Sequence, residues 1–334
     1  MRAARRSRQT PLFLGLVLSA TLAWIIGRKE RLVRPSTIAF AREARRTPGY
    51  SFFDWLHGMI YSRWPYLYIG IGTGEHPLSK LIGPIAGSLA VVIPAKPKGM
   101  QALDFADTYH GKVVPPAAAR QLVTVHQEIS LKDLEQVVPY ALARDIILQH
   151  PDHIVVLDCP CRSARANPCL PLDVCLIVGE PFAGYVAEHH AKRSRWITQD
   201  EALAVLSAEH ERGHVHHAFF KDAMLGRFYA ICNCCACCCG AMQAQRNGVP
   251  MLASSGYVAR VAPERCAGCG TCASHCQFAA IAVEDGRAVV DAVKCMGCGV
   301  CVSHCPNEAL ALEADATRGL PLELDRLMAE VMPG

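Results

Sequence analysis

Residues 266–276 read CAGCGTCASHC and residues 295–306 read CMGCGVCVSHCP, so one cysteine spacing occurs twice near the end of this 334-residue chain. In each copy three cysteines follow one another at intervals of three residues, and a fourth follows after four. The first cysteines of the two copies are twenty-nine residues apart, and the segments after each copy also match in outline. The stretch is an internal repeat, and it decides the fold of the C-terminal part of the chain.

The spacing of these cysteines favours iron–sulfur chemistry. Three thiolates separated by two residues each can wrap a tight loop around three corners of an iron–sulfur cube, while the fourth corner is supplied from elsewhere. Glycines between the ligands permit unusual backbone dihedrals, and their amides can form an anion-binding nest. The alternative is zinc, whose structural sites usually use two separated cysteine pairs. His275 and His304, each just before a fourth cysteine, are expected to face solvent or to pack.

With this ligand pattern, the region from about Val261 to Leu312 resembles the two-cluster bacterial ferredoxin family. The resemblance implies a compact α+β module with pseudo-two-fold symmetry, residues 257–315, that holds two 4Fe-4S clusters and transfers single electrons. It also implies that the last cysteine of each run crosses to the other cluster. One cube is then assigned to Cys266, Cys269, Cys272 and Cys305, and the other to Cys295, Cys298, Cys301 and Cys276. Gln277 departs from the family, which usually has proline at this position.

An uncharged and mostly apolar stretch covers residues 9–27, after four arginines among the first eight residues. Crossing a bilayer as a helix takes roughly 17–25 such residues, so we predict an N-terminal transmembrane helix within residues 1–30. Lys and Arg residues are more numerous after the stretch than before it, which favours the cytoplasmic face for the remaining chain. The predicted localisation is therefore the cell membrane, with a single pass. A cleaved secretory signal is the alternative interpretation.

Composition indicates a folded chain that binds metal. The sequence is 51% hydrophobic and 19% charged, with a net charge of +4, which is sufficient for two domains beyond the anchor. Its 18 cysteines indicate metal binding in a reducing compartment rather than disulfides. A nucleic-acid partner is not expected, because no basic patch is interleaved with aromatic residues and the helix expected after Thr198 carries Asp200, Glu201 and Glu209.

Between the anchor and the repeat we predict a juxtamembrane region, residues 31–125, and a mixed α/β cysteine-rich middle domain, residues 126–256. Residues 316–334 form a C-terminal tail. Apolar spacing predicts a helix from Ser130 and a buried strand over residues 153–158. Thr198, with Glu201 at the capping-box offset, predicts the start of another helix.

Ten further cysteines lie in the middle domain in two groups, and none of their spacings matches a standard ligand run. Thiolate is a soft ligand that suits iron–sulfur chemistry. We therefore expect an additional iron–sulfur cluster, or zinc, held by members of both groups: Cys159, Cys161, Cys169, Cys175, Cys232, Cys234 and Cys235. The alternatives are buried free cysteines or a redox-active thiol set. The elements at residues 159–162 and 231–235 also resemble a region of other ferredoxin-containing bacterial and archaeal iron–sulfur proteins, which implies no particular reaction.

Together these features predict a membrane-anchored iron–sulfur electron-transfer protein with an α+β fold. Its expected partners are redox proteins, including a membrane oxidoreductase, and the lipid bilayer. The alternative is an iron–sulfur oxidoreductase subunit with a catalytic centre in the middle domain. No nucleotide loop, flavin fingerprint or nucleophile motif is recognisable. A carrier or subunit is therefore favoured over a stand-alone enzyme, and no catalytic residue is assigned.

Overall fold

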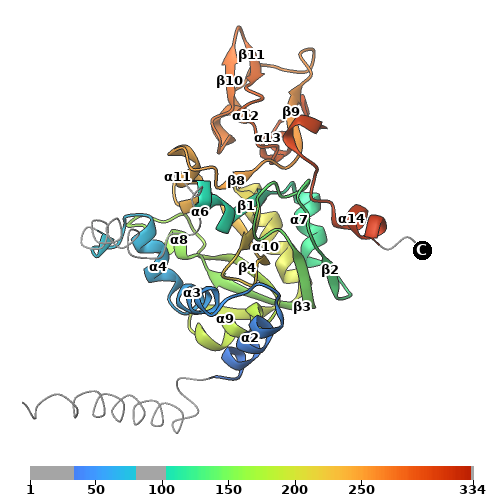
Figure 1. The fold of residues 1–334 in the computed structure, drawn as a ribbon. Coiled ribbons are helices and arrows are strands. Elements are labelled where there is room, and N and C mark those ends of the chain that lie inside the picture. The colour runs from blue at the N-terminus through green and yellow to red at the C-terminus, as the bar shows by residue number, and fades with distance from the viewer. Residues whose placement is uncertain (1–33, 80–102, 332–334) are drawn as a thin grey trace, which may run out of the picture.

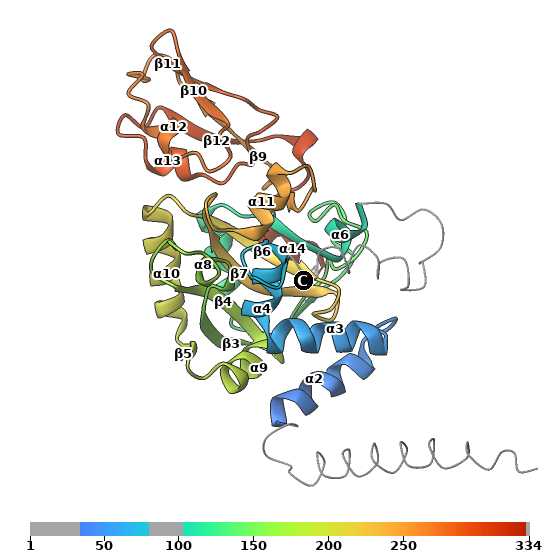
Figure 2. The same ribbon diagram turned by 90° about the vertical axis from the view of Figure 1, so that its left-hand side faces the viewer.

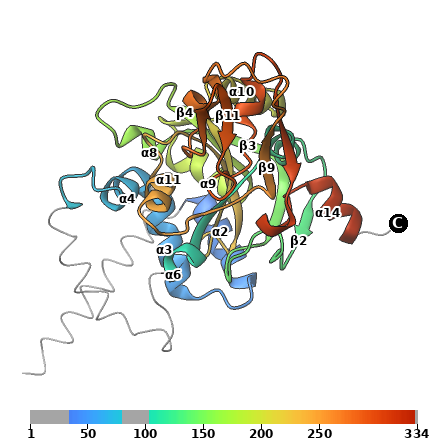
Figure 3. The ribbon, with the colours of Figure 1, turned by 90° about the horizontal axis from the view of Figure 1, so that it is seen from above.

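The computed structural model of the chain describes residues 34–79 and 103–331. They form a sheet domain, described residues 34–253, and a smaller repeat domain, residues 257–315, which stands on one side of the sheet domain (Figures 1 and 2). After the repeat domain, η1 (Ala316–Arg318) and α14 (Leu324–Val331) return to the sheet domain, where α14 lies beside β2 (Figure 3).

The sheet domain is built on eight strands in the order β2-β3-β4-β7-β6-β1-β8, with β5 pairing with β3. The pairs are antiparallel except that β1 and β8 run parallel. The strands are β1 (Tyr109–Val113), β2 (Ile129–Leu131), β3 (Ile146–Asp158), β4 (Asp173–Glu180), β5 (Ser194–Ile197), β6 (Val215–Lys221), β7 (Arg227–Cys234) and β8 (Leu252–Ala253).

Two apolar cores lie on opposite faces of this sheet, because successive side chains of a strand point to opposite sides. In β3, Val155 and Leu157 enter the first core, whereas Ile154 and Val156 enter the second. The first core is covered by α2 (Pro35–Arg46), α3 (Phe52–Arg63), α4 (Pro65–Gly72), α9 (Phe182–His189) and α11 (Gly240–Arg246). The second is covered by α7 (Pro116–Val123), α10 (Gln199–Glu211) and α14. Two short helices, α6 (Leu103–Thr108) and α8 (Pro160–Ser163), complete the domain.

Two of the three local predictions in this domain are confirmed. The expected strand at 153–158 is the second half of β3, and α10 begins after Thr198, whose hydroxyl accepts from the Glu201 amide at 3.2 Å. The helix expected from Ser130 is wrong, because this segment is β2, in which buried Ile129 and Leu131 flank exposed Ser130. Its pairing with β3 decides the conformation, and tertiary pairing overrides local apolar spacing.

The predicted fold class and localisation need correction. The transmembrane helix expected within residues 1–30 lies outside the described residues, and no helix of the described chain is both long and apolar enough to cross a bilayer. The described α10, with 13 residues, is about 20 Å long at 1.5 Å per residue, against a hydrocarbon core of about 30 Å. No described helix supports the predicted single-pass fold and localisation, and the described residues form a mixed α/β fold with a curled sheet.

The repeat domain has internal two-fold order. Strand β9 (Tyr257–Val261) pairs with β12 (Leu310–Ala314), and β10 (Ile281–Glu284) pairs with β11 (Arg287–Val290), both antiparallel. Each cysteine run contains one short helix, α12 (Thr271–His275) or α13 (Val300–Ser303). Both helices begin after a glycine in the left-handed region, Gly270 with φ 78° and Gly299 with φ 82°. Glycine adopts this conformation without steric cost.

Candidate metal centres

The eight cysteines of the repeat domain surround two small cavities of about 20 Å³ each. One is lined by an outer set: Cys266, Cys269, Cys272 and Cys305. The other is lined by an inner set: Cys276, Cys295, Cys298 and Cys301. Each set combines three cysteines of one run with the last cysteine of the other, as in the assignment made from the sequence. Their ligation of iron stays a prediction.

Backbone amides donate to four of these sulfurs in two symmetric pairs. The amides of Ala280 and Ala309 each donate to the last cysteine of a run, Cys276 and Cys305, at 3.2 Å. The first cysteine of each run accepts from a strand, Cys266 from Ala288 at 3.4 Å and Cys295 from Ala259 at 3.5 Å. Amides that point at sulfur stabilise thiolate and help to set the potential of a bound cluster. The donor set therefore fits iron–sulfur ligation.

Close backbone approach in both loops requires glycine. Gly268 has φ 64°, and a Cβ there would lie 2.1 Å from the carbonyl oxygen of Gly286. Gly297 has φ 65°, and a Cβ there would lie 2.2 Å from the carbonyl oxygen of Tyr257. The equivalent glycines of the two runs thus let each cysteine loop rest directly on a strand or hairpin of the domain.

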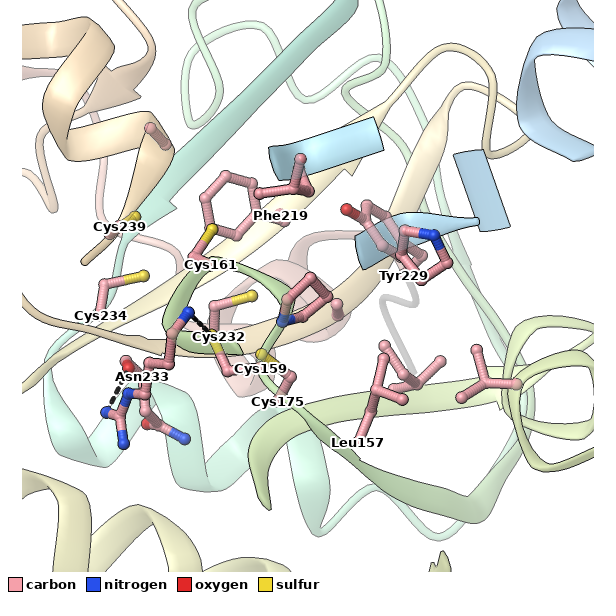
Figure 4. A pocket seen from close by; sticks show the side chains of 18 of the residues that line it. Leu157, Cys159, Cys161, Cys175, Phe219, Tyr229, Cys232, Asn233, Cys234 and Cys239 are labelled. Atoms are coloured by element: carbon pink, nitrogen blue, oxygen red, sulfur yellow. Dashed lines mark hydrogen bonds between the residues drawn. The ribbon is translucent and has the colours of Figure 1, made fainter. Parts of the chain in front are cut away.

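Eight cysteines of the sheet domain line one larger cavity of about 80 Å³. Besides Cys235 and Cys238, it is lined by six thiols after which we call it the six-thiol cavity: Cys159, Cys161, Cys175, Cys232, Cys234 and Cys239. In Figure 4 their sulfurs gather around one space, between the end of β3, the start of β4 and the end of β7. The rest of this six-thiol cavity is mainly apolar and aromatic, and includes Tyr61 and Tyr229, whose hydroxyls lie 2.8 Å apart.

The six thiols form a connected series. Cys175 interacts with Cys232 and Cys159, and Cys159 with Cys161. The series continues from Cys161 to Cys239 and from there to Cys234. The hydrogen bond with Cys161, together with burial, raises the pKa of the Cys159 thiol to about 12. Without a cation the Cys159 thiol is therefore neutral near pH 7, and a bound metal would favour its thiolate.

A buried polar network fixes the segments that carry these thiols. Arg162, next to Cys161, pairs with Glu209 at 2.5 Å and donates to the carbonyl oxygen of Asn233 at 3.0 Å. Asn233, between Cys232 and Cys234, donates to the carbonyl oxygen of Val174 at 2.7 Å. Burial alone would raise the pKa of Glu209, but hydrogen bonds from His214 and Arg162 hold it below its ordinary value. The network thus connects all three cysteine segments through charged and amide groups.

The remaining four cysteines of the sheet domain form a second group, of which Cys235 and Cys238 also line the six-thiol cavity: Cys169, Cys235, Cys237 and Cys238. The sequence analysis assigned Cys169 and Cys235 to the same centre as the other five predicted ligands, whereas the structure brings these two together with Cys237 and Cys238. Cys237, Cys238 and Cys239 were not among the predicted ligands. The sequence feature that could have indicated these three cysteines is the dense cysteine run at residues 232–239. The sequence does not show which cysteines of this run lie close to Cys169.

The inner set lies against the sheet domain. Met296 and Val300 of the repeat domain belong to the first core, and Phe278 and Cys298 pack against it. Gln277, the residue that departs from the ferredoxin pattern, accepts from the Ala236 amide at 2.8 Å and donates to the Gly213 carbonyl at 2.9 Å. The loop after Cys276 is therefore bonded directly to the cysteine run 232–239.

His275 and His304 pack between the domains, in agreement with one of the roles expected for them. Their rings stack at 4.3 Å, and His304 donates to the carbonyl oxygen of Glu211 at 3.0 Å. His275 also approaches Gly213, where an added Cβ would lie 3.1 Å from its ring. These histidines contribute to the contact between the domains, and neither lines a cysteine cavity.

Comparison with known proteins agrees with this geometry. The family model described as the 4Fe-4S dicluster domain matches residues 258–306. This chain contains a ferredoxin-like iron–sulfur domain. The match spans both cysteine runs and ends at Pro306, and it does not include the ten cysteines of the sheet domain. No curated protein matches the chain.

Proposed function

We propose that the protein transfers single electrons between a redox protein partner and a metal centre in the sheet domain, and that the repeat domain holds two 4Fe-4S clusters. The observation that carries this proposal is the sorting of eight cysteines into two cavities of equal size, about 20 Å³, with four thiols each. The symmetric amide donors support equal roles for the two sets. A 4Fe-4S cluster bound to each set would supply one-electron chemistry.

The positions of the two sets indicate the order in which an electron would pass between the redox partner, the two clusters and the sheet domain. In the outer set Cys269 is exposed, so a redox partner can approach this side of the domain. In the inner set Cys295 and Cys301 are buried, and Cys298 packs on the core that also contains Cys159 and Cys175. The outer set therefore suits exchange with a partner, and the inner set suits exchange with the sheet domain.

The six-thiol cavity is proposed as the site of a further iron–sulfur centre. Among the described residues, no three of its thiols lie within 4.8 Å of one another, and the same is true of the inner and outer sets. Such wider spacing suits a cluster rather than a single ion, because ligands of one tetrahedral ion lie about 3.8 Å apart at a bond length near 2.3 Å. The apolar lining would restrict water around the centre, which affects its potential.

Iron and acid-labile sulfide analysis with EPR of the reduced protein tests the proposal. The matched variants are Cys269→Ala for the outer set, Cys298→Ala for the inner set and Cys161→Ala for the six-thiol cavity. We expect each variant to lose a distinct signal, and each repeat-domain variant to lose about four iron and four sulfide per chain. Folded, anaerobically purified protein without iron would contradict the whole proposal, whereas unchanged iron and signals in Cys161→Ala would remove the centre in the sheet domain.

A second candidate function is an oxidoreductase subunit with its catalytic centre in the six-thiol cavity. The observation that favours it is the volume of this cavity, about 80 Å³ against about 20 Å³ for each repeat-domain cavity. The excess exceeds the roughly 10–15 Å³ that one water requires. Cyanide added to the reduced protein should then shift the EPR signal that Cys161→Ala removes. An unshifted signal favours the carrier.

A further inference from the structure

Four thiols of the sheet domain converge beside the six-thiol cavity, between its wall and the surface: Cys235 and Cys238 are buried, Cys169 is partly exposed and Cys237 is exposed. Cys169 belongs to the segment between α8 and β4, and Cys235, Cys237 and Cys238 belong to the segment between β7 and α11. All four sulfurs lie within 4.8 Å of one another. Sγ of Cys237 is 3.1 Å from Sγ of Cys169 and 3.6 Å from Sγ of Cys238. We call this group the four-thiol cluster.

We propose that the four-thiol cluster binds one thiophilic metal ion, Zn²⁺ or iron, separately from every iron–sulfur cluster. A single ion held tetrahedrally at about 2.3 Å from each thiolate places the sulfurs about 3.8 Å apart. The measured separations of 3.1 and 3.6 Å lie near this value. Among the described residues this is the one cysteine group that meets the 4.8 Å limit. A cube with sulfide corners would need wider spacing, and no three thiols of the inner or outer set meet the 4.8 Å limit among the described residues.

The surroundings favour the negative charge of such a site. Four thiolates and one divalent ion carry a net negative charge, which a neighbouring cation can offset. Arg165 provides it, because its guanidinium donates to the carbonyl oxygen of Cys238 from Nε at 3.3 Å and from Nη2 at 3.1 Å. Arg165 is itself held by Glu75 and by Gln243. These bonds orient the Cys238 backbone, as outer-shell groups orient ligands in other metal sites.

The ion would connect two segments that the sheet leaves separate. Cys169 lies in the segment after α8, sixty-six residues before Cys235. Cys235 and Cys238 also line the six-thiol cavity, so the same ion would fix part of its wall. The proposed role is therefore structural. It does not depend on the number or kind of clusters in the repeat domain.

Metal and sulfide analysis of anaerobically purified protein tests the site. The test variant is Cys169→Ser with Cys237→Ser, because Cys237 is exposed and Cys169 is partly exposed, so folding should tolerate both changes. We expect the wild type to hold about one zinc or iron per chain that acid-labile sulfide does not match, since four thiolates complete the coordination of one ion. The double variant should lose that ion and no sulfide. The control Cys269→Ser should lose iron and sulfide in equal amounts and keep the unmatched ion.

Protein that is purified without the ion is titrated anaerobically with Zn²⁺ and passed through gel filtration. Retention of about one Zn²⁺ per chain by the wild type, and of none by the double variant, supports the site. The proposal is overturned if both proteins retain the same metal, or if the double variant loses iron and sulfide together. It is also overturned if thiol counting shows a Cys169–Cys237 disulfide in the anaerobic wild type. The Zn²⁺ titration compares the wild type with the double variant without reference to any cluster, so its outcome is distinguishable from a failure of the electron-transfer proposal.

Discussion

In the repeat domain, cysteines three residues apart share a cavity, whereas the six-thiol cavity of the sheet domain collects cysteines from positions as distant as Cys159 and Cys239. The repeat domain places its thiols by loop geometry, with glycines that rest on neighbouring strands. The sheet domain places its thiols through strand order, because the ends of β3 and β7 and the start of β4 meet at one side of the sheet.

The two domains differ in whether the ligands of a site can be recognised from a short stretch of sequence. A loop that wraps a cluster needs a fixed spacing and small residues, and both are visible in the sequence. A site assembled by a sheet needs correct strand pairing and a buried network that orients each segment. Neighbouring cysteines can then fall into different groups: Cys238 lies within 4.8 Å of three other thiols, and the adjacent Cys239 is not a member of that group. The predictions below compare the two modes of assembly.

The largest effect is expected for Arg162→Met in the sheet domain. Arg162 and Glu209 are each 1% exposed, and removal of the guanidinium leaves the buried carboxylate with Arg212 and His214 as its remaining partners. Breaking a buried pair in this way costs about 3–5 kcal/mol of unfolding free energy. Urea titration followed by circular dichroism measures the loss. EPR should show that signals of the sheet-domain centre weaken while those of the repeat domain persist.

The matched control for this change is the double variant Arg162→Met with Glu209→Met. Replacing both partners by apolar residues removes the stranded charge, so the double variant should recover part of the stability that the single variant loses. A single variant that loses less than about 1 kcal/mol, the range of exposed pairs, would show that the network does not hold the cysteine segments.

Gly268→Ala should disturb the repeat domain in a different way. The alanine Cβ would meet the Gly286 carbonyl oxygen at 2.1 Å, in addition to the cost of φ 64°. An unfavourable backbone conformation costs about 1–3 kcal/mol, and the loop must also move. We expect iron analysis to show loss of about four iron per chain from the outer set. Gly286→Ala is the control, since it has φ 73° with nothing within 4 Å of the added Cβ. Equal iron loss in both variants would rule out the contact as the cause.

Gln277→Leu tests the hydrogen-bonded contact between the repeat domain and the sheet domain. The change removes hydrogen bonds to the Ala236 amide and the Gly213 carbonyl, which costs about 1–2 kcal/mol for two net hydrogen bonds. Hydrogen exchange should increase at both of these segments. If the proposed transfer path is correct, freeze-quench EPR should show slower reduction of the sheet-domain centre. Pro306→Leu, at the equivalent and exposed position of the second run, should change neither measurement.

The sequence predicts the repeat domain in detail and the sheet domain only in pieces. Spacing identifies the two cysteine runs, the ferredoxin resemblance supplies the exchange of their last cysteines, and Thr198 and Glu201 correctly mark the start of α10. The segment at Ser130 misleads, because Leu131 and Val137 pack in the second core from an extended strand and a turn. The grouping of Cys235 with Cys169 also depends on tertiary structure, since the two lie sixty-six residues apart in the sequence. Gln277 is visible only as a departure from a pattern, and its partners show its role.

The smallest effect is expected for Arg265→Gln. This change removes an exposed ion pair of the repeat domain, to be compared with the buried Arg162–Glu209 pair of the sheet domain. Arg265 precedes the outer set and pairs with Glu308 at 2.9 Å, but the two side chains are 50% and 84% exposed. An exposed pair of this kind contributes about 0.2–1 kcal/mol, and salt screens it. Urea titrations at low and high ionic strength should therefore show a small loss that shrinks as salt is added. A loss as large as that of Arg162→Met would mean that charge pairs, rather than loop spacing and amide–sulfur bonds, hold the repeat domain together.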